Sequence, residues 1–79
     1  MYTLAMAKTD YKENWIDSFT LVKRGDEWML EVSQGDAPAI RRCICTARGD
    51  LRMFKTVDSA IKTAEQIGFA VHALRFEAI

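Results

Sequence analysis

Two cysteines and the single histidine of this 79-residue chain are the side chains that could form a nucleophilic or metal-binding centre: Cys43, Cys45 and His72. A catalytic thiol needs a base and a third group that orients the base, and all three residues fall in segments expected to be strands. A closed zinc site needs four ligands. Residues i and i+2 of a strand lie about 6.5–7 Å apart, whereas the Cβ atoms of a disulfide lie about 3.8 Å apart. The pattern therefore predicts reduced, structural thiols and no metal ion.

Carboxylates and glycines give no catalytic pattern either. Asp58 and Glu65 lie about two turns apart on the expected exposed face of a helix, which is typical of a solvated surface. The four glycines are isolated turn or cap residues, so the chain has no glycine-rich phosphate loop. We therefore expect a protein that is not an enzyme and that uses no cofactor.

The charged residues divide unevenly between the two halves of a chain whose net charge is zero. Residues 1–38 carry four Lys or Arg against seven Asp or Glu, and residues 39–79 carry seven against four. This asymmetry indicates a polar molecule with one basic face, although a chance distribution explains it equally well.

A helix is predicted over residues 57–67, where apolar side chains recur with a 3.6-residue period: Val57, Ala60, Ile61, Ala64 and Ile67. Thr56 is suited to the N-cap and Gly68 to the left-handed position after the last turn. A helix of about eleven residues is marginal in water alone. We therefore expect its apolar stripe to pack on a sheet.

Two hairpins are expected to supply that sheet. Residues 19–33 form the first, around Gly25-Asp26, and this register places Leu21 opposite Leu30 and Phe19 opposite Val32.

Residues 40–55 form the second hairpin, around Arg48-Gly49-Asp50, and its register has two solutions. A two-residue loop pairs Cys45 with Phe54, and a three-residue loop pairs Cys45 with Met53. The second solution buries more apolar surface, so we favour it.

Strand alternation over residues 42–47 puts Cys43, Cys45 and Ala47 beneath the helix and Arg42, Ile44 and Thr46 on the outer face. An outer face with apolar side chains between arginines indicates a contact surface. The predicted binding residues are Arg42, Ile44, Thr46, Arg52, Phe54 and Lys55. In the alternative interpretation the N-terminal helix covers this face, and Ile44 is buried beneath Trp15 or Tyr11.

Residues 1–18 are expected to form a lid or an edge segment. Within it, residues 1–7 form a strand or a loosely packed tail, and residues 9–18 a short helix. Tyr11, Trp15 and Ile16 lie on one side of this helix, which favours a lid packed on the sheet over an aromatic recognition helix. With a last strand at residues 70–79, the predicted fold is a single α+β domain spanning residues 1–79. Its order is ββββαβ, with a small, largely antiparallel sheet and one helix on one face.

The stretch RGDLRMFKTVDSAIKTAEQIGF, together with the closing LRFEA, resembles small partition-associated accessory proteins of conjugative plasmids, the ParC-like group. The likeness consists of Phe-Lys-Thr, then Val-Asp-Ser-Ala opening a helix, then Ile-Gly-Phe closing it. It covers roughly the last third of the chain. The resemblance implies an accessory protein of a mobile genetic element, plasmid or phage, with a binding role.

Two other functions stay open. One is an inhibitor of a host defence complex, such as an anti-CRISPR protein, that uses the acidic side chains of the first half: Asp10, Glu13 and Asp17. The other is nucleic-acid binding by the basic hairpin, with Phe54 stacked on an unpaired base. Because the chain is neutral overall, we rank a protein partner ahead of nucleic acid.

Size and hydropathy complete the expectations. A chain of this length buries only about 60–65% of its unfolded surface, so a homodimer is a further option. The sequence has no signal-peptide pattern and no apolar run of about 18 residues. We therefore expect a cytoplasmic protein that does not bind membranes.

Overall fold

The computed structural model describes residues 1–34, 41–70 and 74–78, and it has an α+β fold, as predicted. Its elements in chain order are α1 (Leu4–Lys12), β1 (Ser18–Arg24), β2 (Glu27–Ser33), β3 (Arg41–Cys43), β4 (Met53–Phe54), α2 (Val57–Ile67) and β5 (Leu74–Ala78). Residues 35–40, 71–73 and 79 lie outside the described part, and the prediction for His72 falls there.

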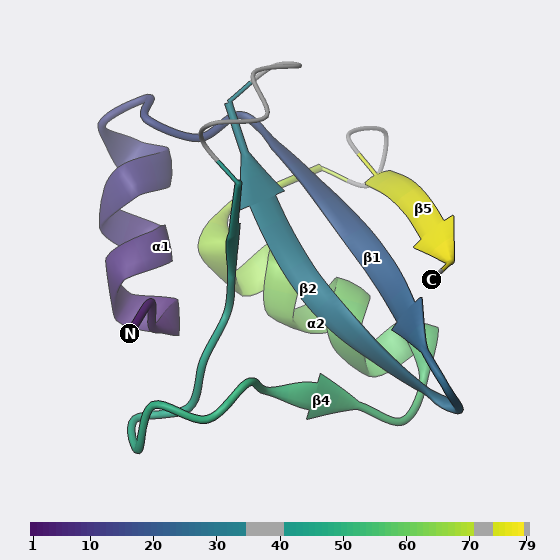
Figure 1. The fold of residues 1–79 in the computed structure, drawn as a ribbon. Helices are drawn as coiled ribbons and strands as arrows, with labels where there is room; N and C mark the ends of the chain where they lie inside the picture. Colours follow the sequence, from purple (N-terminus) through teal and green to yellow (C-terminus); the bar gives the residue numbers. More distant parts are fainter. Residues whose placement is uncertain (35–40, 71–73, 79) are drawn as a thin grey trace.

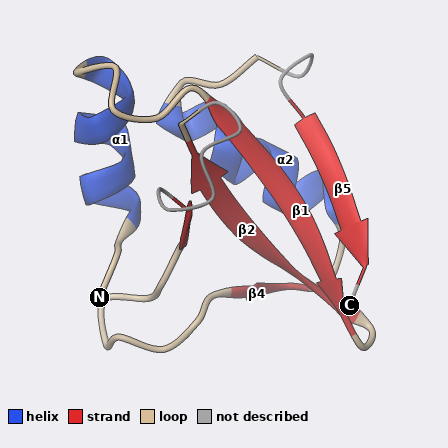
Figure 2. Cartoon of the chain, turned by 45° about the horizontal axis from the view of Figure 1, so that its top comes forward, coloured by secondary structure: helices blue, strands red, loops and turns tan. Residues whose placement is uncertain are grey.

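The strands form one sheet, and α2 lies behind it while α1 stands at the edge where β3 lies (Figures 1 and 2). The strand order is β3-β2-β1-β5, and β4 also pairs with β2. β5 runs parallel to β1, and the other pairs are antiparallel. The chain can return parallel to β1 because α2 intervenes, as parallel pairing requires a long crossover.

One apolar core lies between the sheet and α2. β1 and β2 contribute alternate residues from one face, because side chains of a strand point to opposite faces in turn. α1 adds Ala7 and its flanking residues Tyr2 and Ile16 to the same core. The buried members from the sheet and α2 include Phe19, Leu21, Leu30, Val32, Ala60, Ala64 and Ile67.

Helix α2 spans the predicted residues, and its predicted ends are confirmed. The Thr56 hydroxyl oxygen accepts a hydrogen bond from the Ser59 amide at 3.2 Å. At the other end, Gly68 has φ +130°, and the amides of Gly68 and Phe69 both donate to the Ala64 carbonyl at 3.2 Å. Local capping chemistry therefore sets the length of α2.

The first hairpin is also confirmed, with the predicted register. Leu21 pairs with Leu30, Phe19 with Val32, and the turn has Gly25 at φ +65°.

The second hairpin differs from both predicted registers. β3 and β4 each pair with β2 and make no ladder with one another. Between them the chain leaves the sheet and returns, and Cys45 forms an isolated antiparallel bridge with Leu51. The turn is tied by the Thr46 amide donating to Asp50 O at 2.7 Å and the Gly49 amide donating to Thr46 O at 2.9 Å. The prediction was wrong because it considered pairing only between the two strands of this segment and not pairing of each strand with β2.

The predicted faces of this segment are reversed as well. Ile44 is 1% exposed and belongs to the core, although we expected it outside. Cys43 pairs with Glu31 and lies on the other side of the sheet, with its thiol 4.0 Å from Glu31 Oε2. Burying the larger apolar side chain of Ile44 under the helix removes more apolar surface from water than burying a cysteine would.

The N-terminal helix begins earlier than predicted. α1 starts after Thr3, whose hydroxyl oxygen accepts from the Met6 amide at 3.4 Å, and it ends before Asn14 at φ +65°. Phe69, which follows α2, packs edge-on against Tyr11 of α1, with the ring centroids 4.8 Å apart. α1 therefore packs beside α2.

Gly68 offers a test of this junction. A Cβ added there would lie 2.7 Å from the Tyr11 ring, on a backbone with φ +130°. We expect Gly68→Ala to lower the free energy of unfolding by about 2–4 kcal/mol. The matched control is Gly25→Ala, where φ is +65° and, apart from its chain neighbours, none of the described residues has a heavy atom within 4 Å of the added Cβ. This control should cost about 1 kcal/mol. Urea unfolding followed by circular dichroism measures both, and equal losses would contradict this packing.

Candidate binding site between α1 and β3

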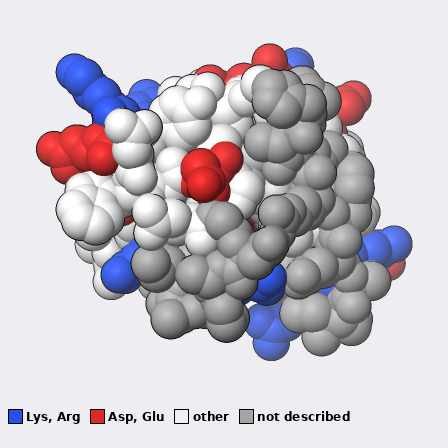
Figure 3. Space-filling model, turned by 90° about the horizontal axis from the view of Figure 1, so that it is seen from above, with Lys and Arg blue, Asp and Glu red and all other residues white. Residues whose placement is uncertain are grey.

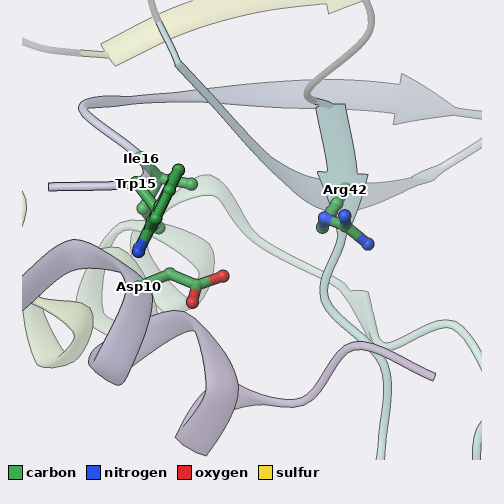
Figure 4. A pocket seen from close by; sticks show the side chains of 4 residues that line it. All are labelled: Asp10, Trp15, Ile16 and Arg42. Carbon is green, nitrogen blue, oxygen red and sulfur yellow. The ribbon is translucent and has the colours of Figure 1, made fainter. Parts of the chain in front are cut away.

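A pocket of about 390 Å³ opens between α1 and β3 and is lined by Asp10, Trp15, Ile16 and Arg42. Figure 4 shows Asp10 on α1, Trp15 and Ile16 together in the connection from α1 to β1, and Arg42 across from them on β3. We call this cavity the α1–β3 pocket. It joins a carboxylate, a guanidinium and an indole from three separate parts of the chain.

Sheet pairing places Arg42 at this position. Arg42 pairs with Val32, so its side chain leaves the sheet on the side of the core, at the edge next to α1. Its guanidinium lies 5.6 Å from the centroid of the Tyr2 ring, within the range of a cation–π contact. Arg42 is exposed, and in the described part of the chain it forms no ion pair. The guanidinium is thus positioned by an aromatic ring and still able to accept an anionic partner.

Tyr2 also fixes the carboxylate of the pocket. Its hydroxyl donates a hydrogen bond of 2.7 Å to Asp10 Oδ2. Burial raises the pKa of Tyr2 well above its usual value, and the bond to the Asp10 carboxylate raises the pKa further, while Arg42 acts in the opposite direction. The phenol therefore stays protonated and keeps donating to Asp10 at neutral pH.

Trp15 is the exposed aromatic of the pocket wall. Its side chain is 60% exposed, whereas the adjacent Ile16 is 2% exposed and belongs to the core. The Trp15 amide donates to the Asp10 carbonyl at 2.8 Å, and Asn14 before it has φ +65°. This turn fixes the backbone that carries the indole while Ile16 anchors the next residue.

A second, shallower hollow of about 310 Å³ continues along α1 and is lined by Ala5, Met6, Thr9 and Asp10. Asp10 lines both hollows. Met6 is 47% exposed, so an apolar side chain extends the surface beyond the pocket. The exposed side of α1 thus places apolar side chains, Met6 in one hollow and Trp15 in the other, near the Asp10 carboxylate.

The six residues predicted to form a binding face do not form one surface. Ile44 and Phe54 are 1% and 4% exposed and lie in the core, so neither can contact a partner. Arg52 has its guanidinium 5.0 Å from the Phe54 ring, Thr46 is half-buried in the turn, and Lys55 is exposed. Arg42 lies in the α1–β3 pocket, where our prediction did not place it.

Sequence reasoning underrated the other residues of the pocket. We considered Trp15 as part of a recognition helix but preferred a packed lid, and we gave Tyr2 no role. The spacing of Trp15 from Tyr11 did indicate an aromatic face, but Asn14 breaks the helix between them and turns Trp15 outward. No local pattern signals that Tyr2 and Asp10 bond across eight residues.

The opposite side of the sheet carries Glu31, Arg41 and Cys43. Arg41 Nη1 forms an ion pair with Glu31 Oε1 at 3.3 Å. The angles of this contact do not meet those of a hydrogen bond, so among the described residues Oε1 accepts none. Burial raises the pKa of the Cys43 thiol, and the nearby Glu31 charge and Cys45 raise it further. Since the thiolate is the reactive form, this environment makes Cys43 a poor nucleophile. Among the described residues no group of three or more His, Cys, Asp or Glu is placed to hold a metal ion.

Comparison of the chain with models of protein families, with curated proteins and with solved structures finds no match. In the part of the chain that the structure describes, no helix has the length and apolar character needed to cross a membrane.

The Tyr2–Asp10 bond predicts how stability depends on pH. Burial and the bond to Asp10 raise the pKa of Tyr2 above its usual value of about 10. The protonated phenol therefore stabilises the fold fully below about pH 10, and this contribution is lost as pH rises further. Tyr2→Phe should cost about 1 kcal/mol at pH 7 and should flatten the decline of stability above pH 10. Urea unfolding at pH 7, 10 and 11 measures the effect, and parallel declines in the two proteins would contradict it.

Proposed function

We propose that this protein is a non-catalytic protein-binding module whose contact surface is the α1–β3 pocket together with the exposed side of α1. The observation that carries the proposal is Trp15, an indole 60% exposed on the wall of a cavity that also holds an exposed guanidinium. Tryptophan and arginine are the residue types most enriched among the residues that dominate protein–protein binding energy. Because the free energy gained on binding grows with the apolar area removed from water, burying this large exposed side chain against a partner would contribute strongly to affinity.

The chemistry of the pocket favours a protein partner over nucleic acid. Asp10 lines the wall that α1 forms, where its carboxylate would repel a phosphate group. Phe54 is buried and so cannot stack on a base, which removes the aromatic contact of the nucleic-acid hypothesis. Among the described side chains visible in Figure 3, acidic and basic ones are interspersed. A nucleic-acid-binding role for the exposed Arg48 and Lys55 stays a lesser alternative.

The wider role that we propose is that of an accessory protein of a mobile genetic element acting in the cytoplasm. It rests on the resemblance of residues 48–69 to the ParC-like group. Inhibition of a host defence complex is the second candidate. The exposed residues Glu13 and Asp17 favour it, because they add negative charge two positions before and two positions after Trp15 in the chain.

Cross-linking at Trp15 tests the contact surface. A photoreactive phenylalanine derivative in place of Trp15 should form adducts in a lysate of cells that express the protein, because the proposed interface covers this side chain. The matched control carries the same group at Gln66, an exposed position on α2. Mass spectrometry identifies the adducts, and adducts at position 66 but not at position 15 would contradict the proposal.

Removing the Trp15 indole by substitution with alanine tests how much this side chain contributes to partner affinity. Trp15→Ala should weaken partner binding by about 30-fold or more, the effect of losing a residue worth about 2 kcal/mol. It should change the free energy of unfolding by less than about 0.5 kcal/mol, because the side chain is largely outside the core. Binding is measured by surface plasmon resonance with the partner that cross-linking identifies, and Gln66→Ala serves as the control. Unchanged affinity for Trp15→Ala would count against the proposal.

A further inference from the structure

We infer that the protein partner of the α1–β3 pocket is a second copy of this chain, bound through a two-fold symmetric interface. The inference rests on the proposed function, because it assigns an occupant to the same surface. In a two-fold interface both protomers use the same patch, so the patch must be complementary to itself. The charges and the shape of this surface meet that requirement, and its area is sufficient for a small interface.

The first property is charge. Asp10 and Arg42 line the pocket from opposite walls, α1 and β3, as Figure 4 shows, and within the described residues no ion pair joins them. A two-fold axis through the pocket would bring Asp10 of one protomer to the partner's Arg42, and Arg42 to the partner's Asp10. The interface would then contain two reciprocal ion pairs. A partner with one sign of charge would satisfy only one of these residues and would be repelled by the other.

The second property is shape. Trp15 stands on the wall of the hollow rather than filling it. The same symmetry that pairs the charges would bring the indole of each protomer toward the partner's pocket, between apolar Ile16 and the aliphatic part of Arg42. Each protomer thus has both the protruding side chain and the cavity that an isologous contact needs.

The third property is area. Because each Trp15 is 60% exposed, the two side chains can bury about 200–300 Å² on association, whereas a specific interface requires about 1,000 Å² or more in total. Further exposed surface lies along α1, where Ala5, Met6 and Thr9 line the second hollow next to Asp10. Interfaces at the small end of the size range are typical of weak, reversible association, so we expect a dissociation constant on the order of micromolar.

Charge reversal tests the reciprocal pairs. Asp10→Lys places two cations at each contact of the dimer, and Arg42→Glu places two anions there, so each variant alone should dimerise at least about tenfold more weakly than the native chain. In an equimolar mixture of the two variants, the introduced lysine faces the introduced glutamate at one contact, and the native Asp10 faces the native Arg42 at the other. A heterodimer should therefore form. Sedimentation equilibrium measures the native chain, each variant alone and the mixture, and circular dichroism checks that each variant is folded.

A second variant keeps the test decisive if either charge reversal disturbs the Tyr2 contacts. Trp15→Ala leaves Tyr2, Asp10 and Arg42 in place. It should raise the dimer dissociation constant by about 1,000-fold, because each of the two identical contacts loses an indole worth about 30-fold in affinity. Gln66→Ala, on the exposed face of α2, should leave that constant unchanged.

The outcomes separate this inference from the proposed function. A native chain that stays monomeric at about 1 mM, while position 15 cross-links to a different protein, overturns the second-copy inference and leaves the binding surface standing. A monomer without adducts at position 15 overturns both. A dimer that neither Trp15→Ala nor either charge reversal weakens shows a different interface and also overturns the inference.

Discussion

The structure depends on one constraint, which is that β3 and β4 share the same edge of β2. β3 pairs with residues 31–33 of β2, and β4 pairs with residues 28 and 29. Between these pairings the Ile44 amide donates to the Leu30 carbonyl at 2.9 Å, and the Arg52 amide donates to the Ile44 carbonyl at 3.1 Å. The chain from Cys45 to Leu51 must therefore leave the sheet. Ile44 is the last residue before this departure, and its side chain lies in the core.

This excursion in turn positions the N-terminal segment. The Cys45 amide donates to the Tyr2 carbonyl at 2.7 Å, and Thr3 forms a parallel bridge with Cys45. Thr3 then caps α1, so the helix starts at the point where the sheet edge ends. Tyr2 is buried by this anchoring, and its ring and hydroxyl position Arg42 and Asp10. The α1–β3 pocket is thus a consequence of how the edge of β2 is filled.

Local chemistry explains which parts of the fold were predictable from the sequence. Thr56, the apolar stripe and Gly68 define α2 without reference to other segments, and Gly25-Asp26 fixes the register of the first hairpin. The second hairpin has an equally clear Gly49 turn, but each of its strands pairs with β2 and not with the other. The paired residues lie 8 to 12 positions apart for β3 and 24 to 26 positions apart for β4. The pocket was not predicted for the same reason, because Tyr2, Asp10 and Arg42 meet only after the edge of β2 has formed. Non-local pairings of this kind leave no periodic signal in one sequence.

The central claim is that the surface around Trp15 and Arg42 binds a second copy of the chain. The most direct measurement is a concentration series of ¹H–¹⁵N NMR spectra from about 10 µM to about 1 mM, with the Trp15 indole N–H signal assigned by Trp15→Phe. If this surface binds a second copy, this signal, the Arg42 side-chain signals and the α1 amide signals will shift together along one saturating curve. The amide signals of Lys62 and Glu65 on the exposed face of α2 will stay in place. Spectra that do not change with concentration, or shifts confined to α2, would contradict it.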